Sequence, residues 1–227
     1  MFLLYRILTL ILFPIFVLII YLRRFLNKED KKRYVEKIFV AKSNLPKNKK
    51  IFWIHAASIG ELNSVVPIIK EIILNNNDIF VLLTSSTLSS SQLIKKEIFD
   101  PNRFKHLFFP IDVKFLVNKF LDNWRPDFII FVDSEVWPNY MLEISKRKIP
   151  LMLLNGRITK KTYNRWKKFP SLSKKIFSLY DLCLSASEES NENLKLLGAK
   201  NVKFLGNIKF CSIIDKKTDN KNFHLIF

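Results

Sequence analysis

The stretch IFWIHAASIGE at residues 51–61 decides the fold. Its first four residues are hydrophobic and predict a buried strand, and small residues follow at Ala56–Ser58 and Gly60, where the chain must turn. Residues 62–74 then carry apolar side chains at helical spacing, so we expect Glu61 at the mouth of a helix that follows a strand. Ligands of open α/β sheets bind at junctions of this kind.

The alternation of strand and helix continues to residue 205. Further strands are predicted at 79–84, 104–108, 128–132, 150–154, 182–186 and 202–205. Helices are predicted at 62–74, from the Ser-rich start at 85–91, and at 113–124, 137–146, 159–169, 172–179 and 188–197. Short hydrophobic strands separated by helices indicate a Rossmann-like α/β fold, a parallel sheet with helices on both faces. The sequence contains no GxGxxG or GxxxxGK[ST], which excludes a nucleotide-dependent dehydrogenase.

Composition narrows the class of protein and its partners. The net charge of +18 favours anionic partners such as phosphate-bearing substrates and acidic lipid head groups. Nucleic acid is not expected, because no recognised nucleic-acid motif accompanies the charge. Only Cys183 and Cys211 occur, so we expect no disulfide framework and a reducing compartment. The three His residues are scattered, and no metal site is predicted.

The first 25 residues predict a membrane anchor helix. Residues 7–22 are uncharged but reach only about 24 Å, which is short of a hydrocarbon core of about 30 Å. Adding residues 2–5, with Arg6 at the far interface, makes about 31 Å, and Pro14 is expected to kink the helix. Basic residues after the span place the body of the protein on the cytoplasmic side of the membrane. A single span is favoured, and a helix lying in the inner leaflet is the alternative.

The expected organisation has four parts. Residues 1–25 are the anchor, 26–50 a basic linker with one short helix, 51–210 the Rossmann-like domain and 211–227 a polar tail.

Four motifs, in this order, resemble the N-terminal half of the 3-deoxy-D-manno-octulosonic acid (Kdo) transferases. They are IHAASIGE at 54–61, DSEVWPN at 133–139, LLNGRIT at 153–159 and LGNIKF at 205–210. The resemblance covers residues 1 to about 210. It implies the N-terminal, acceptor-binding domain of a GT-B glycosyltransferase at the inner membrane. Such enzymes transfer Kdo from CMP-Kdo to the 6′-hydroxyl of the lipid A precursor (lipid IVA) without a cofactor or a catalytic metal.

The resemblance also implies a second domain, which would hold CMP-Kdo. Family members are about twice as long as this chain, so we expect the donor to be held by a missing or separate donor domain. This polypeptide is then expected to bind acceptor but to transfer Kdo poorly by itself, because one domain cannot close over the reactants. The alternative is a non-catalytic, membrane-bound lipid A precursor-binding subunit or a truncated inactive homologue.

Glu61 has two interpretations. The spacing Ser58-x-x-Glu61 matches a capping box, in which the carboxylate closes the helix N-terminus, and the residues alone favour this cap. The resemblance instead implies that Glu61 is the general base for the acceptor hydroxyl, with the helix dipole keeping it ionised. A Glu61 side chain folded back onto its own amides would count against the base.

The resemblance assigns transition-state stabilisation to Glu135 and Lys209, although the residues alone favour a helix cap and a solvated lysine. It also indicates an acceptor- and phosphate-binding surface, whose densest part is equally well explained as a solvated helix face. The predicted surface consists of Ser58, Gly60, Asn155, Arg157, Lys160, Lys161 and Arg165. Exposed apolar residues between 159 and 179 are expected to suit acyl chains.

Overall fold

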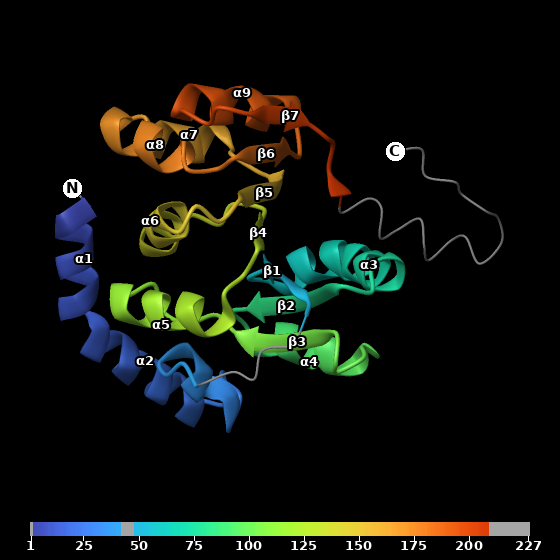
Figure 1. Ribbon diagram of the computed structural model, residues 1–227. Helices are drawn as coiled ribbons and strands as arrows, with labels where there is room; N and C mark the ends of the chain where they lie inside the picture. Colours follow the sequence, from blue (N-terminus) through green and yellow to red (C-terminus); the bar gives the residue numbers. More distant parts are fainter. Residues whose placement is uncertain (1, 42–47, 209–227) are drawn as a thin grey trace.

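The computed structural model describes residues 2–41 and 48–208, and Figure 1 shows a parallel sheet between helices. The strands are β1 (Lys50–His55), β2 (Ile79–Ser85), β3 (Phe104–Phe108), β4 (Phe128–Val132), β5 (Leu151–Gly156), β6 (Leu182–Ser185) and β7 (Val202–Phe204). The helices that cover them are α3 (Ile59–Asn75), α4 (Leu88–Lys96), α5 (Lys114–Trp124), α6 (Pro138–Lys146), α7 (Lys160–Trp166), α8 (Pro170–Phe177) and α9 (Glu188–Leu197). The predicted parallel α/β sheet is therefore confirmed, and each predicted strand is present within two residues of its expected ends.

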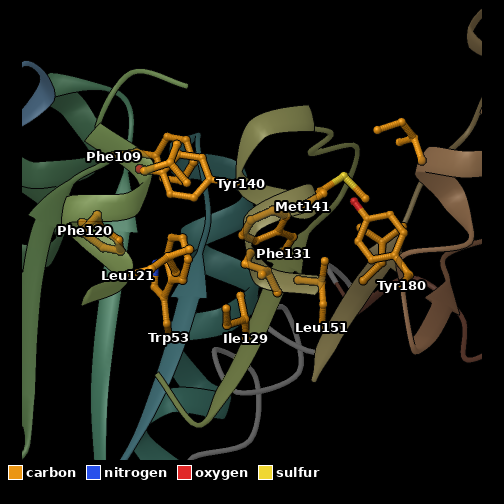
Figure 2. Close-up of a cluster of buried hydrophobic side chains, with 14 of the residues drawn as sticks. Trp53, Phe109, Phe120, Leu121, Ile129, Phe131, Tyr140, Met141, Leu151 and Tyr180 are labelled. Atoms are coloured by element: carbon orange, nitrogen blue, oxygen red, sulfur yellow. The ribbon is translucent and has the colours of Figure 1, made fainter. Parts of the chain in front are cut away.

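The two faces of β1 build two separate cores. Ile51 and Trp53 belong to a core that also contains side chains of α5, α6, α8 and α9, whereas Ile54 belongs to a core with side chains of α3 and α4. Successive side chains of a strand point to opposite faces, so a strand that is covered on both faces is hydrophobic throughout. Figure 2 shows Trp53 in the larger core beside Phe120 and Leu121 of α5.

The strand order places a crevice beside β1. The seven strands that the structure describes run in the order β3-β2-β1-β4-β5-β6-β7, with all neighbours parallel. The chain therefore builds outward from β1 to β3, then crosses back to place β4 on the other side of β1. His55 at the end of β1 pairs with Phe131 of β4, so the loops after these two strands start side by side and diverge. Open sheets bind ligands at such a switch point.

The N-terminal segment forms two helices, α1 (Phe2–Ile11) and α2 (Phe13–Phe25), in place of the single helix expected. Among the described residues no one helix has the length and apolar character to cross a membrane. Only α1 and α2 taken together reach that length, and they are bent by 49° at Leu12. Pro14 lies in the first turn of α2 and has no N–H for the carbonyl one turn earlier, which explains the position of the bend.

Both helices contact the domain. Tyr5 donates a 2.8 Å hydrogen bond to Asp112, and the Arg6 guanidinium lies 2.6 Å from the Glu143 carboxylate on α6. The ring of Phe13 packs edge-on against Phe115 of α5. Figure 1 shows α1 beside the ends of α5 and α6. The expectation that Arg6 reaches a far membrane interface is therefore wrong, because its charge is paired with the domain.

The predicted linker also packs on the sheet. Its short helix is η1 (Arg33–Lys37), a 3-10 helix. Arg33 donates to the backbone carbonyl of His106, and the Glu36 carboxylate accepts from the backbone N–H of Phe108, both at 2.8 Å. These bonds attach the segment to β3. The predicted tail at 211–227 lies outside the described residues.

Asp112 is the buried carboxylate that joins α1 to α6, and it makes stability depend on pH. It accepts hydrogen bonds from Tyr5 and from the backbone N–H groups of Asn139 and Tyr140. Burial nevertheless raises the pKa of Asp112 from 3.8 to about 6. A folded-state pKa above the unfolded value means that the folded protein binds more protons between these two pH values. This group therefore stabilises the fold at low pH, and that contribution is lost as pH rises through 6.

We expect the free energy of unfolding of wild type, relative to the Asp112→Asn variant, to increase by about 2–3 kcal/mol from pH 7 to pH 4. Subtracting the variant removes the contributions of the other carboxylates. Urea unfolding at several pH values measures the difference. A difference that is independent of pH would contradict the assignment.

Candidate active site

Glu61 lies in the first turn of α3, which begins three residues before its predicted start. Ser58 is the N-cap residue, and its hydroxyl accepts from the backbone N–H of Glu61 at 3.4 Å. The carboxylate of Glu61 accepts from the Ser58 hydroxyl at 2.7 Å and from the backbone N–H of Ala57 at 2.8 Å. The side chain is thus folded back onto its own turn, as a capping residue is, and this geometry counts against its role as the general base.

This arrangement leaves each carboxylate oxygen of Glu61 able to accept one more hydrogen bond. A carboxylate oxygen has two lone pairs, and each oxygen of Glu61 uses one in the cap. The residue is 8 % exposed. Next to it, Gly60 has a negative φ, and a Cβ added there would meet nothing within 4 Å, so the turn does not require glycine. The backbone beside Glu61 is instead open to an approaching group.

Burial has the largest effect on the pKa of Glu61. Burial raises the pKa of Glu61, and the nearby charges of Glu135 and Asp133 raise it further, against the lowering effect of the hydrogen bonds from Ser58 and Ala57. A raised pKa brings a carboxylate nearer to the operating pH at which a general base is most effective. Glu61 begins the helix that follows β1, and Asp133 and Glu135 follow β4, which pairs with β1, so the three carboxylates lie at the same edge of the sheet.

Glu135 is held in place from three directions. Its carboxylate accepts a hydrogen bond from the indole of Trp137 and lies 3.3 Å from Nε2 of His55, and its backbone carbonyl accepts from the Tyr180 hydroxyl at 2.5 Å. Since the side chain is only 15 % exposed, these contacts fix the orientation of its charge.

His55 is the residue of the site that sequence reasoning missed. As the last residue of β1 it points to the same face as Trp53, where it is fully buried and stacks on Phe109 with ring centroids 3.8 Å apart. Its Nδ1 lies 3.0 Å from Oγ1 of Thr84. The same Nδ1 lies 3.2 Å from the backbone carbonyl of Thr84, while Nε2 faces the Glu135 carboxylate without a hydrogen bond to it. The sequence did contain a signal for this position: alternate residues of a strand point to the same face, so His55 shares a face with Trp53.

The loop after β5 is tied to the loop after β4. The backbone N–H of Arg157 donates to the carbonyl of Asp133 at 3.2 Å, and Ser134 donates back to the carbonyl of Arg157 at 2.6 Å. Asn155 has a φ of 57° and is buried, and its Oδ1 accepts from the backbone N–H of Ile208 at 3.2 Å. Asn155 therefore holds the chain immediately before Lys209, which lies outside the described residues.

The remaining predicted residues lie further along the chain. Lys160, Lys161 and Arg165 are exposed on α7, which packs against α9, and Arg157 is exposed before it. In the following helix, α8, Ile176 and Phe177 are buried. Phe169, which precedes α8, is exposed. The expectation of an apolar surface for acyl chains across residues 159–179 is therefore wrong for α8.

No group of three or more His, Cys, Asp or Glu side chains in residues 2–41 and 48–208 is arranged to hold a metal ion. Independence from metals stays a prediction.

Comparison with known proteins places the chain in a family. The sequence model described as "3-Deoxy-D-manno-octulosonic-acid transferase (kdotransferase)" matches residues 32–212. The 3-deoxy-D-manno-octulosonic acid transferase of Rickettsia bellii is 34% identical over 92% of this chain and 49% of its own length. A probable mitochondrial enzyme of the same name from Arabidopsis thaliana is 34% identical over 72% of this chain and 36% of its own. The chain thus spans about half the length, or less, of these curated relatives.

Solved structures resemble the fold alone. A putative UDP-N-acetylglucosamine 2-epimerase from Listeria monocytogenes superposes with a TM-score of 0.52 at 15% identity, over 78% of this chain and 50% of that one. The UDP-GlcNAc 2-epimerase of Neisseria meningitidis superposes with a TM-score of 0.52 at 14% identity, over 74% of this chain and 49% of that one.

Proposed function

Because the chain belongs to the Kdo transferase family, we propose that it forms the acceptor side of an enzyme that transfers Kdo from CMP-Kdo to the 6′-hydroxyl of a lipid A precursor. The observation that carries this proposal is the placement of Glu61 after β1 and of Asp133 and Glu135 after β4, the strand that pairs with β1, at the switch point of the sheet. An isolated cap does not explain three carboxylates gathered at the edge where such folds bind ligands.

In the proposed reaction Glu61 takes the proton of the 6′-hydroxyl. The acceptor oxygen forms a bond to the anomeric carbon of Kdo, the bond from that carbon to the phosphate of CMP breaks, and CMP leaves with the electron pair. Glu135, oriented by Trp137 and His55, supplies negative charge opposite the oxocarbenium-like carbon. Lys209 is proposed to neutralise the departing CMP. No step of the proposal uses a metal.

The exposed basic residues suit the phosphates of the acceptor. Arg157 is the first candidate because its backbone is hydrogen-bonded to Asp133 and Ser134, in the loop that also carries Glu135. Lys160, Lys161 and Arg165 extend the positive surface along α7, and each contributes about 1 kcal/mol near an anionic membrane.

The two N-terminal helices are proposed to lie on the cytoplasmic face of the inner membrane. Their outward side is apolar and exposed, and it ends at Arg23 and Arg24, which suit acidic lipid head groups. The large exposed apolar residues are Leu3, Leu4, Ile7, Leu8, Leu10, Ile11, Ile15, Leu18, Ile19, Leu22 and Phe25. Monomeric proteins rarely expose so large a contiguous apolar surface without a partner.

Binding of the acceptor tests this proposal directly. The purified chain in detergent is expected to bind the tetraacylated disaccharide bisphosphate saturably, and an Arg157→Ala/Lys160→Ala variant is expected to bind about tenfold more weakly. An Arg125→Ala/Lys148→Ala variant, which removes two exposed charges at the opposite ends of the strands, is the matched control. Failure of wild type to bind this lipid would refute the proposal.

A second function is supported by the closed cap of Glu61. In a non-catalytic subunit that only binds the lipid A precursor, Glu61 would need no other partner than Ser58 and Ala57. Turnover measurements with Glu61 variants separate the two functions.

A further inference from the structure

A cavity of about 490 Å³ lies between the N-terminal helices and the domain. Its apolar walls come from α2, from the loop after β3 and from the start of α6. The residues that form these walls are Phe16, Ile19, Ile20, Phe109, Ile111 and Trp137. A volume of this size falls within the usual range of small-molecule sites.

Most polar side chains in the walls already have hydrogen-bond or ion-pair partners within the protein. Glu29 is paired with Arg23 at 2.7 Å and with Lys37 at 2.6 Å. Asp112 accepts from Tyr5 and from two backbone N–H groups. The hydroxyl of Thr9 donates to the carbonyl of Arg6. An occupant therefore does not need hydrogen-bonding groups of its own. A water molecule, in contrast, needs two to four polar partners.

The position of the cavity connects the apolar surface to the candidate site. Ile19 is 45 % exposed and also lines the cavity, so it lies at the rim, on the same helix as the exposed residues Leu18 and Leu22. Trp137 lines the cavity and donates its indole N–H to Glu135. A hydrocarbon chain that passes Ile19 reaches Trp137, and its polar end then lies near the carboxylates.

We propose that this cavity binds one acyl chain of the acceptor lipid. The inference rests on the proposed function, and it specifies what that function leaves open, namely how a lipid is held while its sugar faces Glu61. The acceptor is favoured over bulk phospholipid because the cavity wall and the site share Trp137. A chain bound there fixes the distance from the membrane surface to the reacting hydroxyl.

The test fills the cavity and leaves its bonded groups intact. Ser86 lines the cavity, and only its backbone carbonyl is used by Lys37, so Ser86→Phe adds bulk without removing that bond. Ser89→Phe, at an exposed position of α4, is the matched control. A second pair acts at the rim, where Ile19→Trp narrows the entrance and Leu18→Trp places the same ring on the outer surface.

Two probes are used: the tetraacylated disaccharide bisphosphate and the same disaccharide with all acyl chains removed. Wild type and the controls are expected to bind the acylated probe at least about tenfold more tightly than the deacylated one. Ser86→Phe and Ile19→Trp are expected to lose most of that ratio while binding the deacylated probe as wild type does, which shows that they are folded.

The outcomes separate the inference from the function on which it rests. If the acylated probe keeps its advantage in both cavity variants, the cavity is not the acyl site, although the proposed function stands. If phosphatidylglycerol micelles displace the acylated probe from wild type as well as unlabelled acceptor does, the cavity holds bulk lipid and the inference is overturned. If wild type binds neither probe, the proposed function itself fails.

Discussion

Glu61→Gln is expected to lower Kdo transfer by about 10²–10⁴-fold and to leave acceptor binding within about threefold of wild type. Glutamine is chosen because it serves equally well at this position of a capping box, where Glu or Gln bonds back to the N-terminal amides. It is neutral and cannot take a proton from the acceptor hydroxyl. The variant can keep the hydrogen bond from Ala57, its amide NH2 then donates to the Ser58 hydroxyl instead of accepting from it, and the base is removed.

The measurement is CMP release with the lipid acceptor, in a reconstitution that supports turnover by wild type, together with acceptor binding and urea unfolding. If Glu61 is only a cap, Glu61→Gln keeps wild-type turnover, and the second, non-catalytic function is then the correct one. Glu61→Ala is the companion variant: it is expected to add a loss of about 1 kcal/mol in stability, because it removes the cap as well.

The pH profile supplies an independent check on the same residue. A base must be ionised, so kcat/KM falls as pH drops through the pKa of Glu61, and burial moves this limb to higher pH than for an ordinary glutamate. The hydrogen bond from Ser58 lowers that pKa. Ser58→Ala is therefore expected to shift the acid limb to still higher pH, a change that a purely structural role of Ser58 would not produce.

Hydrophobic pattern was sufficient for the strands because all of them except the edge strand β7 contain buried residues. Strand β1 reads IFWI in the sequence, and its Ile51, Trp53 and Ile54 fill the cores on both faces, so a run without polar residues is the expected signature. The start of α3 was predicted three residues late. Ile59 and Gly60 carry no helical signal by themselves, and only the bonds between Ser58 and Glu61 define the first turn.

The site depends on contacts between residues far apart in the sequence, which the pattern does not contain. His55 meets Glu135 only because β4 pairs with β1 across the switch point, and strand order has no local signature. Arg6 was expected at a membrane interface because an apolar run with a flanking charge is typical of a span. Its partner Glu143 is 137 residues away, so the docking of α1 was not predictable from the sequence.

Trp53→Ala is expected to lower the free energy of unfolding by about 3–5 kcal/mol, which is a large part of the 5–15 kcal/mol typical of a domain. Trp53 is fully buried, and its ring contacts come from four parts of the chain: Phe109 after β3, Phe120 of α5, Phe131 of β4 and Tyr140 of α6. Figure 2 shows these side chains converging on one part of the core. No single neighbour can move to fill the space that the ring leaves, so the cavity persists.

Trp53 also links the core to the site through Thr84. Its indole N–H donates to Oγ1 of Thr84 at 2.9 Å, and the same oxygen lies 3.0 Å from His55, which faces Glu135. Trp53→Phe keeps most of the packing but loses this donor, and we expect it to cost only about 1–2 kcal/mol. Urea unfolding measures the loss in the free energy of unfolding for both variants, provided that the m-value is unchanged. Trp166→Ala, at a half-buried position, is the control. Equal losses for Trp53→Ala and Trp166→Ala would contradict a central role of Trp53 in the fold.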